Sequence, residues 1–135
     1  MRLYLDASAI IYSIEGVSGF RKSALTWIES VEGADEGLML TSRLSRLECL
    51  VKPLKTGRTE LLALYEGFFV RDKLRLIEVS ADVIERACDL RARYGFRAPD
   101  AIHLATAILF EADTFLSGNA ALERCSELKV VTLKP

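Results

Sequence analysis

The sequence is poor in the residues that stabilise secreted or zinc-dependent proteins. It has three cysteines, Cys49, Cys88 and Cys125, and no two of them form a CxxC pair. An odd number of widely spaced cysteines disfavours a disulfide framework and a structural zinc site. The N-terminal residues also lack the pattern of a signal peptide. Together these absences predict a protein of the reducing cytoplasm.

Long hydrophobic runs, a strong net charge and several common catalytic motifs are absent as well. The longest apolar stretch, residues 101–110, is too short to cross a membrane and contains His103. The net charge is −1, so any nucleic-acid partner must be recognised through local rather than overall charge. No GxSxG, GxxxxGK[ST] or GxGxxG motif occurs, which disfavours nucleophile-elbow hydrolases, P-loop proteins and dinucleotide-binding proteins.

The hydrophobic pattern alternates between strand-length and helix-length segments. With 135 residues, of which half are hydrophobic, the chain is predicted to form one domain over residues 1–135. Strands are expected at residues 2–5, 38–41, 75–79, 114–117 and 129–133. Helices are expected at about 8–15, 20–32, 43–55, 59–70, 81–94, 100–111 and 119–125. Such alternation predicts an α/β domain with a parallel sheet covered on both faces.

Three local signals define the expected helices at 81–94 and 100–111. Ser80 precedes the first of them as an N-cap, and Gly95 ends it. Pro99 fits the first turn of the second helix, where its missing N–H costs nothing.

Polar residues follow two of the expected strands. Asp6 comes directly after the first strand, and Asn119 follows the fourth. In parallel sheets, ligands bind beyond the carboxyl ends of the strands, so both side chains are placed for one cleft. Asp6 also suits an N-cap of the next helix, an equally good interpretation of that residue alone. Ser8 is a second candidate for the cap, or for holding a metal-bound water.

Glu48 interrupts an apolar pattern that predicts a buried helical stripe. The stripe comprises Leu44, Leu47, Val51 and Leu54. Its spacing directs Glu48 partly inward, and a buried carboxylate without a partner would be strongly destabilising or would become protonated. The partner is either a basic neighbour, Arg43 or Arg46, or a cation or metal-bound water.

Asp100 opens the most apolar helix of the chain. An acid in a first turn is favoured by the helix dipole, which explains Asp100 without any function. Capping alone, however, does not predict that Asp6, Glu48 and Asp100 share one place. If they meet, their charges repel unless a cation lies between them. Oxygen ligands without histidine or thiolate suit Mg²⁺ or Mn²⁺, which can activate water against a phosphodiester.

Other polar residues support the acidic ones. His103, the only histidine, lies one turn after Asp100, and is either a packed helix residue or a hydrogen-bond partner of an acid. Basic residues flank the acids in two groups, Arg43, Arg46, Lys52, Lys55 and Arg58, and Arg91, Arg93 and Arg97. They are either solvated helix faces or contacts for a polyanion, with Arg43, Arg46, Lys52 and Arg97 the candidates for binding RNA.

Four sequence blocks resemble those of the PIN domain family, most closely the VapC-type toxin ribonucleases. The blocks are YLDASAI (4–10), SRLE (45–48), PDAIHLATA (99–107) and FLSGN (115–119), and they cover essentially the whole chain in order. The first and third blocks are the more specific. The resemblance implies a three-layer α/β/α fold with five parallel strands in the order 3-2-1-4-5.

The resemblance also implies a function. It implies an endoribonuclease dependent on Mg²⁺ or Mn²⁺, with Asp6, Glu48 and Asp100 as acidic metal ligands and catalytic residues. Asn119 matches a position that often carries an acid in the family, and Ser117 matches a small hydroxyl residue before it. An antitoxin partner and a homodimer are implied, and no membrane association. Asn119 also leaves open a catalytically weak or inactive PIN-fold module that binds RNA or protein, and a phosphatase acting on small substrates is a more distant alternative.

Overall fold

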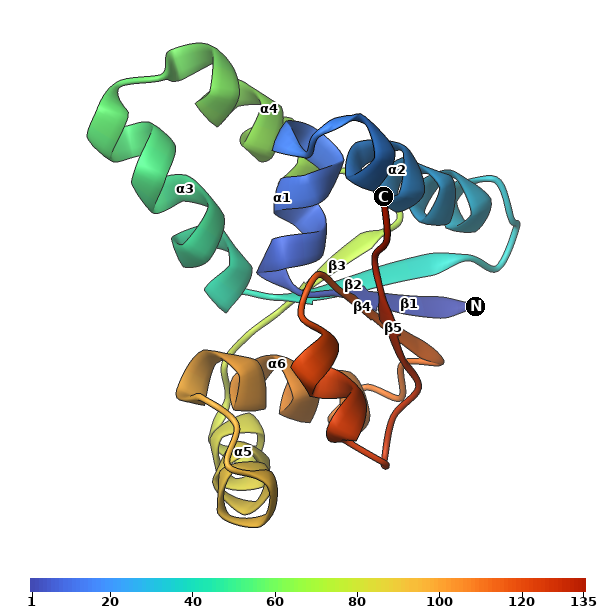
Figure 1. Ribbon diagram of the computed structural model, residues 1–135, viewed down its shortest axis with the longest axis vertical. Coiled ribbons are helices and arrows are strands. Elements are labelled where there is room, and N and C mark those ends of the chain that lie inside the picture. Colours follow the sequence, from blue (N-terminus) through green and yellow to red (C-terminus); the bar gives the residue numbers. More distant parts are fainter.

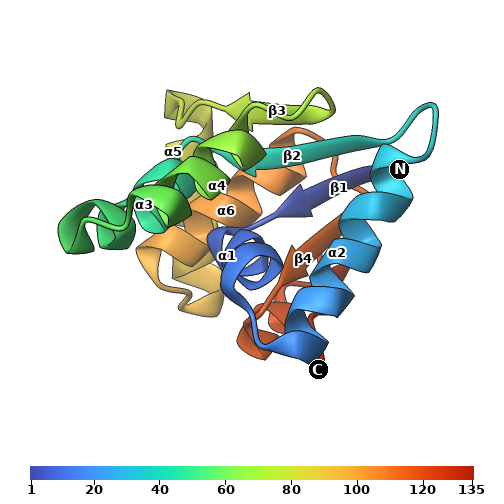
Figure 2. The same cartoon turned by 90° about the horizontal axis from the view of Figure 1, so that it is seen from above.

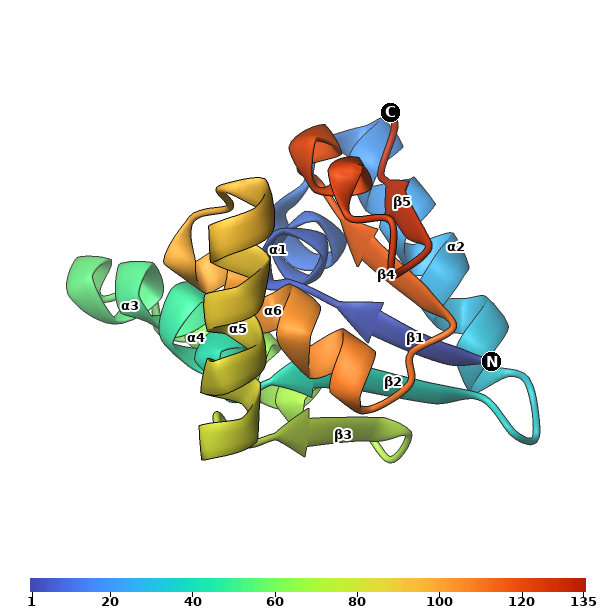
Figure 3. The ribbon, with the colours of Figure 1, turned by 90° about the horizontal axis from the view of Figure 1, so that it is seen from below.

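A parallel five-stranded sheet forms the centre of the protein (Figure 1). The computed structural model describes all residues, 1–135. The strands, in the spatial order β3-β2-β1-β4-β5, are β1 (Arg2–Leu5), β2 (Leu38–Ser42), β3 (Leu74–Ile77), β4 (Thr114–Ser117) and β5 (Val130–Thr132). All four pairings are parallel, so the carboxyl ends of the strands lie at one edge. Figure 3 shows the strands pointing toward the side where α3 and α5 lie.

Helices cover both faces of the sheet (Figure 1). One layer contains α1 (Ala7–Glu15), α2 (Ser18–Glu32), α3 (Leu44–Thr56) and α4 (Thr59–Phe69). The other contains α5 (Ala81–Tyr94), α6 (Ala98–Leu109) and the short 3₁₀ helix η1 (Ala120–Arg124). The three-layer arrangement and the strand order predicted from the family resemblance are therefore confirmed. None of these helices has the length and apolar character needed to cross a bilayer.

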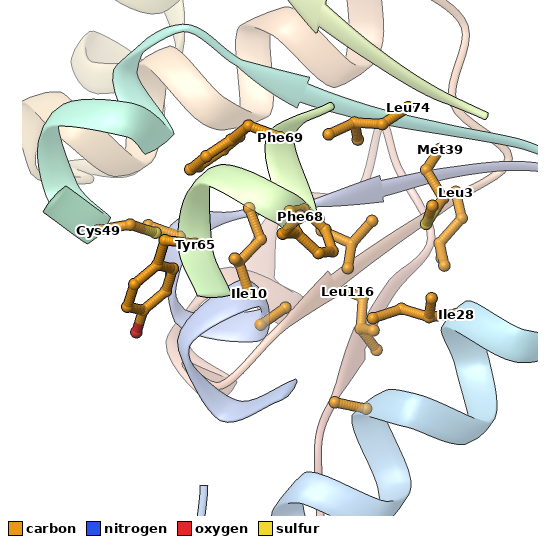
Figure 4. Close-up of a cluster of buried hydrophobic side chains, with 14 of the residues drawn as sticks. Leu3, Ile10, Ile28, Met39, Cys49, Tyr65, Phe68, Phe69, Leu74 and Leu116 are labelled. Carbon is orange, nitrogen blue, oxygen red and sulfur yellow. The ribbon is translucent and has the colours of Figure 1, made fainter. Parts of the chain in front are cut away.

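Successive residues of each strand point to opposite faces, which divides the core in two. Leu3 and Leu5 pack with α1, α2 and α4, whereas Tyr4 packs under α5 and α6. Figure 4 shows part of the first cluster, including Ile10 of α1, Phe68 of α4 and other buried side chains. Burial on both faces explains why the strands read as continuous apolar runs rather than alternating ones. The same alternation directs the side chain of Tyr4, which lies on β1, toward α6.

The predicted element boundaries agree with the structure to within two or three residues. Ser80 accepts a hydrogen bond from the backbone N–H of Val83 at 3.2 Å, and so caps α5 as expected. Gly95 ends α5 in the left-handed conformation, and Pro99 occupies the first turn of α6. The seventh predicted helix is present as the 3₁₀ helix η1. The three cysteines are free.

The prediction of a buried stripe along α3 is wrong. Leu47, Val51 and Leu54 are 61%, 50% and 62% exposed, and α3 instead buries residues of the neighbouring face: Ser45, Cys49, Leu50 and Pro53. The two faces are adjacent on the helix, and both carry apolar side chains. Figure 2 shows the reason, since the far end of α3 extends away from the sheet and leaves one side of the helix uncovered.

Candidate active site

A cleft of about 250 Å³ opens at the carboxyl edge of the sheet. It is lined by Asp6, Ala7, Ser8, Ile11, Glu48, Arg97, Asp100, His103 and Asn119. These residues come from α1, α3, α6 and the segments that follow β1 and β4. The four residues predicted to be catalytic from the sequence therefore line a single cleft. Ser117 does not line the cleft, but its buried hydroxyl donates a hydrogen bond to the carboxylate of Asp6.

Asp6 is held by donors from two separate segments. Its Oδ1 accepts the Ala9 N–H at 3.0 Å, which caps α1, and the Ser8 hydroxyl at 2.6 Å. Its Oδ2 accepts the hydroxyl of Ser117 at 2.6 Å. Burial raises the pKa of Asp6, while His103 and these three donors oppose that rise. Asp6 is therefore the N-cap of α1, as one interpretation of the sequence predicted. Capping does not explain its burial, however, because a cap can be formed by an exposed side chain and Asp6 is only 4% exposed.

The end of β4 is tied to the start of α1 by the same hydroxyls. Ser8 accepts the N–H of Gly118 at 2.8 Å, and Ser117 accepts the N–H of Asn119 at 3.0 Å. Gly118 lies against the ring of Tyr12, where an added Cβ would come within 2.3 Å of the ring. A glycine is therefore needed for this close approach. The two strand ends are fixed relative to each other before any ligand binds.

Glu48 is held by His103, a partner that the sequence offered only as one possibility. Its Oε1 lies 2.6 Å from Nε2 of His103, across the gap between α3 and α6. The alternative that a basic neighbour pairs with Glu48 is wrong. Arg43 pairs with Glu78 on the sheet side, and Arg46 pairs with Glu66 of α4.

Tyr4 completes this contact and was missed in the sequence. Its hydroxyl lies 2.7 Å from Nδ1 of His103, and both side chains are buried. Burial and the charge of Asp6 raise the pKa of Tyr4 well above its usual value, so the phenol stays protonated. The available signal was a tyrosine in a strand buried on both faces, because a buried phenol needs a hydrogen-bond partner. His103 is then both a packed helix residue and a bonded one.

Asp100 and Asn119 form the opposite side of the cleft. Asp100 lies in the first turn of α6, with Oδ2 at 3.4 Å from Nε of Arg97. Asn119 accepts the N–H of Ala121 at 3.1 Å through its side-chain oxygen and so caps η1. The position of each residue at the start of a helix therefore explains it structurally: Asp100 lies in the first turn of α6, and Asn119 caps η1. Neither role uses all the oxygen lone pairs of the side chain.

The basic residues predicted to contact RNA are placed unequally. Arg43, Arg46 and Arg97 each form an ion pair, with Glu78, Glu66 and Asp100 respectively. Lys52 is exposed and has no carboxylate partner. Of the four, Arg97 alone lines the cleft. Exposed ion pairs exchange readily for other anions, so the three arginines remain candidates for phosphate contacts.

The cleft offers oxygen ligands of the kind that Mg²⁺ and Mn²⁺ prefer. No three side chains among the histidines, cysteines, aspartates and glutamates are close enough to bind a metal ion together. Mg²⁺, however, keeps several waters and needs only one or two direct carboxylates. Asp6, Glu48 and Asp100 each retain an oxygen position that no protein donor fills. The donor set therefore fits a hydrated divalent cation.

A soft ligand is absent from the cleft surface. Cys49 is next to Glu48 in sequence, but its side chain is buried in the opposite core. Burial, with the charges of Glu48 and Asp6, raises the pKa of Cys49 to about 12. The thiol is therefore protonated at neutral pH, and only a thiolate binds metals well. This leaves a cleft of hard oxygen ligands, consistent with Mg²⁺ or Mn²⁺ rather than zinc.

Fold and cleft together define a parallel α/β protein with an acidic cleft at the carboxyl edge of its sheet. The PIN domain model matches residues 3–128, and the chain belongs to the PIN domain family. PIN domains are generally nucleases. No curated protein sequence matches the chain significantly.

Solved structures of toxin–antitoxin proteins share this fold. VapBC2 of Rickettsia felis, bound to promoter DNA, aligns with a TM-score of 0.82 at 17% identity over 99% of this chain and 100% of that chain. A toxin–antitoxin complex from Klebsiella pneumoniae gives 0.70 at 23% identity, over 96% of each. VapC20 of Mycobacterium tuberculosis, a toxin that cleaves the sarcin–ricin loop, gives 0.74 at 13% identity over 98% and 99%. At these identities the similarity establishes the shared fold.

Proposed function

We propose that this protein is an endoribonuclease that depends on Mg²⁺ or Mn²⁺ and acts as the toxin of a type II toxin–antitoxin pair. One observation carries the proposal: Asp6, Glu48 and Asp100, which are distant in sequence, line one cleft in a PIN fold. Helix ends explain the positions of Asp6 and Asp100 singly, but not the common location of the three carboxylates. A bound divalent cation would offset the charge of the carboxylates and lower the pKa of a water molecule for hydrolysis of a phosphodiester.

In this proposal, each polar residue of the cleft has a separate role in catalysis. Asp6 and Asp100 hold the cation, directly or through its waters. Glu48, whose Oε2 carries no hydrogen bond from the protein, orients the attacking water. The amide of Asn119 positions a phosphate oxygen, and Ser117 keeps Asp6 oriented through its 2.6 Å hydrogen bond. The substitution of an amide for a fourth acid leaves the site with one charge less, which favours one cation over two.

The substrate is proposed to be RNA that is single-stranded or looped. Arg97 lines the cleft, and its side chain is 81% exposed. An arginine at that place can exchange Asp100 for a substrate phosphate. The solved relative VapC20 is described as cleaving an RNA loop, which supports RNA as the substrate class. Such an enzyme would act in the cytoplasm.

An antitoxin is the proposed regulatory partner. Similar folds have been solved within toxin–antitoxin complexes from Klebsiella pneumoniae and Rickettsia felis. The expected physiological outcome is that overproduction of this chain stops growth and that a co-expressed partner relieves the arrest. Normal growth during overproduction of folded protein would contradict the toxin assignment.

A homodimer is also proposed, through the uncovered side of α3. Leu47, Val51 and Leu54, here called the α3 stripe, are at least half exposed. A second apolar surface lies on α5 and α6, where residues including Ile84, Cys88 and Ile102 line a hollow of about 150 Å³. Two copies related by a two-fold axis can place each stripe in the hollow of the other, which closes both surfaces at once.

Charged side chains near the two surfaces are available for contacts between copies. Lys52 and Lys55 are neighbours of the α3 stripe in sequence, Asp82 and Glu85 lie on α5, and Arg91 lines the hollow. None of these side chains forms an ion pair within the chain. A dimer could therefore pair the acidic residues of α5 in one copy with the lysines of α3 in the other.

Measurement of the mass in solution tests the dimer. Light scattering after size exclusion should give twice the chain mass of 15.0 kDa for the wild type. Leu54→Glu places a charge in the stripe and should give a monomer. Val70→Glu is the matched control, because Val70 is 78% exposed at the end of α4 and outside both surfaces. A wild-type monomer at micromolar concentration would overturn the proposed interface.

A binding module without catalytic activity is the alternative that Asn119 favours. Cleavage of total RNA, with Mn²⁺ or with chelator, separates it from the nuclease. The wild type should cleave only with metal, and Asp6→Asn and Asp100→Asn should not cleave. Asp72→Asn is the control, because Asp72 is exposed and remote from the cleft. Cleavage that survives chelation, or equal cleavage by Asp6→Asn, would contradict the proposal.

A further inference from the structure

We propose that Tyr4 and His103 form a buried hydrogen-bond chain that positions Glu48 for its role in the cleft. The chain runs from the Tyr4 hydroxyl to Nδ1 of His103, 2.7 Å away, and from Nε2 of His103 to Oε1 of Glu48, 2.6 Å away. Tyr4 and His103 are positioning residues here, since neither is assigned a contact with substrate. The inference rests on the proposed function for its catalytic consequence, but not for its geometry.

The direction of each hydrogen bond follows from the chemistry of the groups. An ionised carboxylate only accepts hydrogen bonds, so Nε2 of His103 must carry the hydrogen that Glu48 receives. A neutral imidazole with its hydrogen on Nε2 has an acceptor at Nδ1. The phenol of Tyr4 is protonated at neutral pH and donates to that acceptor. One tautomer of His103 thus satisfies every hydrogen-bonding atom of the chain.

The chain connects three elements, one from each of the three layers of the fold. Tyr4 lies on β1 and faces the α5/α6 layer, where it stacks on Phe115 at 5.0 Å between ring centroids. His103 lies on α6, and its side chain is 3% exposed. Glu48 lies on α3, in the other layer, with its side chain 31% exposed. The contact therefore crosses the edge of the sheet at the cleft and ends on a group that reaches solvent.

Glu48 has little else to hold it. No arginine or lysine pairs with it, and its Oε2 has no donor from the protein. Because α3 is uncovered along its outer side, the helix gives the side chain limited support. A long, rotatable glutamate in this setting would sample several rotamers, and the bond from His103 selects one of them. Partners of this kind typically change metal affinity or activity by about 10–100-fold when removed.

The tautomer of His103 can be measured directly. His103 is the only histidine, so ¹⁵N-histidine labelling gives the signals of one ring. In the metal-free full chain at neutral pH, we expect a protonated Nε2 and an unprotonated, hydrogen-bonded Nδ1. Tyr4→Phe should shift the Nδ1 resonance toward that of a free acceptor and leave Nε2 protonated. A ring protonated at Nδ1, or an unchanged Nδ1 in Tyr4→Phe, would overturn the chain.

The functional consequence is tested on the same variants by Mn²⁺ titration and by RNA cleavage kinetics. Tyr4→Phe and His103→Leu should lower kcat by about tenfold or more, with a smaller change in KM, and weaken Mn²⁺ binding. His103→Gln retains an N–H that can reach Glu48 and should recover part of the loss, which a purely packing role would not produce. Tyr65→Phe is the matched control, because Tyr65 is a buried tyrosine bonded to a carboxylate, Glu15, away from the cleft.

The outcomes separate this inference from the proposed function. If the wild type neither cleaves RNA nor binds Mn²⁺, the proposed function fails, while the histidine spectrum still decides the chain. If the wild type cleaves and folded Tyr4→Phe and His103→Leu match it in kcat and Mn²⁺ affinity, the positioning role is wrong. If His103→Leu does not fold, Tyr4→Phe and His103→Gln decide the question, since Tyr4→Phe removes only the bond to Nδ1 and His103→Gln keeps a donor that can reach Glu48.

Discussion

Asp6 and Glu48 are two carboxylates of one cleft that the fold holds in different ways. Asp6 accepts three hydrogen bonds, from Ser8, Ala9 and Ser117, and is almost completely buried. Glu48 accepts one, from His103, and its side chain is one-third exposed. The first is fixed by the sheet and the helix that follows it, and the second by a side-chain contact between helices.

This difference separates two ways of building a polar site. The position of Asp6 follows from the pairing of β1 with β4, because their carboxyl ends must meet. This position buries the charge of Asp6, which disfavours the ionised carboxylate, and the hydrogen-bond donors to Asp6 offset that effect only in part. Glu48 avoids that cost by staying near solvent, but then depends on one partner for its orientation. We therefore expect changes at Asp6 to affect charge and chemistry, and changes around Glu48 to affect geometry.

The largest expected effect is that of Asp6→Asn on activity. Loss of the charge should lower the cleavage rate by about a hundredfold or more, which corresponds to about 2.7 kcal/mol or more in the activation barrier. The same change should leave the metal-free protein as stable as the wild type or more stable at pH 7. Asparagine caps a helix as well as aspartate does, and it carries no charge to bury.

The sign of this stability effect follows from the pKa of Asp6. Burial raises that pKa above the value in the unfolded chain, so the ionised form disfavours folding once the pH rises through the raised value. The advantage of Asp6→Asn should therefore be larger at pH 7 than at pH 5 and should shrink further as the pH falls toward the ordinary aspartate pKa. Melting temperatures in chelator at pH 7 and pH 5 measure it. A less stable variant at pH 7 would show that the three donors outweigh burial.

The same contrast explains what the sequence revealed. Asp6 and Asn119 were assigned to one cleft because strand ends in a parallel sheet leave little freedom, and Ser80, Gly95 and Pro99 marked helix ends for local reasons. The strand order came from the family resemblance rather than from such arguments. Local signals and strand direction were therefore enough to place residues that adjoin the strands.

Residues on helices were less predictable. α3 carries apolar side chains on two adjacent faces, and only its packing decides that Cys49 and Leu50 are buried while Leu47 and Val51 are exposed. Spacing along one helix contains no information about the angle at which that helix meets the sheet. The bond between Glu48 and His103 depends on that angle, which explains why the sequence left several partners open.

The buried layer under the cleft should be the most sensitive to packing changes. Leu104 of α6 is fully buried, and Leu104→Ala should lower the free energy of unfolding by about 2–5 kcal/mol. Leu64 of α4 is 60% exposed, and Leu64→Ala should change the same quantity by about 0.5 kcal/mol or less. Urea denaturation of both variants gives the comparison. Equal losses would show that the α3/α4 side is packed against something in solution.

A smaller effect is expected when Asp6 loses one donor. Ser117→Ala removes a buried hydroxyl bonded to the carboxylate and should cost about 1–3 kcal/mol in stability. Because that hydroxyl lowers the pKa of Asp6, its loss should raise the pKa further. The pH at which Mn²⁺ binding is half-maximal should then move upward. Ser13→Ala removes a buried hydroxyl bonded to Ile10 and should leave that pH unchanged.

The smallest effect is expected on the exposed side of α3, at the ion pair between Arg46 and Glu66 of α4. The Arg46 guanidinium lowers the pKa of Glu66, so any stability that the pair contributes is present at neutral pH and is lost as the pH falls below about 4. Glu66→Gln should therefore lower the melting temperature only slightly at pH 7, and by less still near pH 4. A large loss at pH 7 would mean that this pair sets the position of α3, on which the contact between Glu48 and His103 depends. In that case the Mn²⁺ affinity of Glu66→Gln should fall as well, which calorimetry on the same protein would detect.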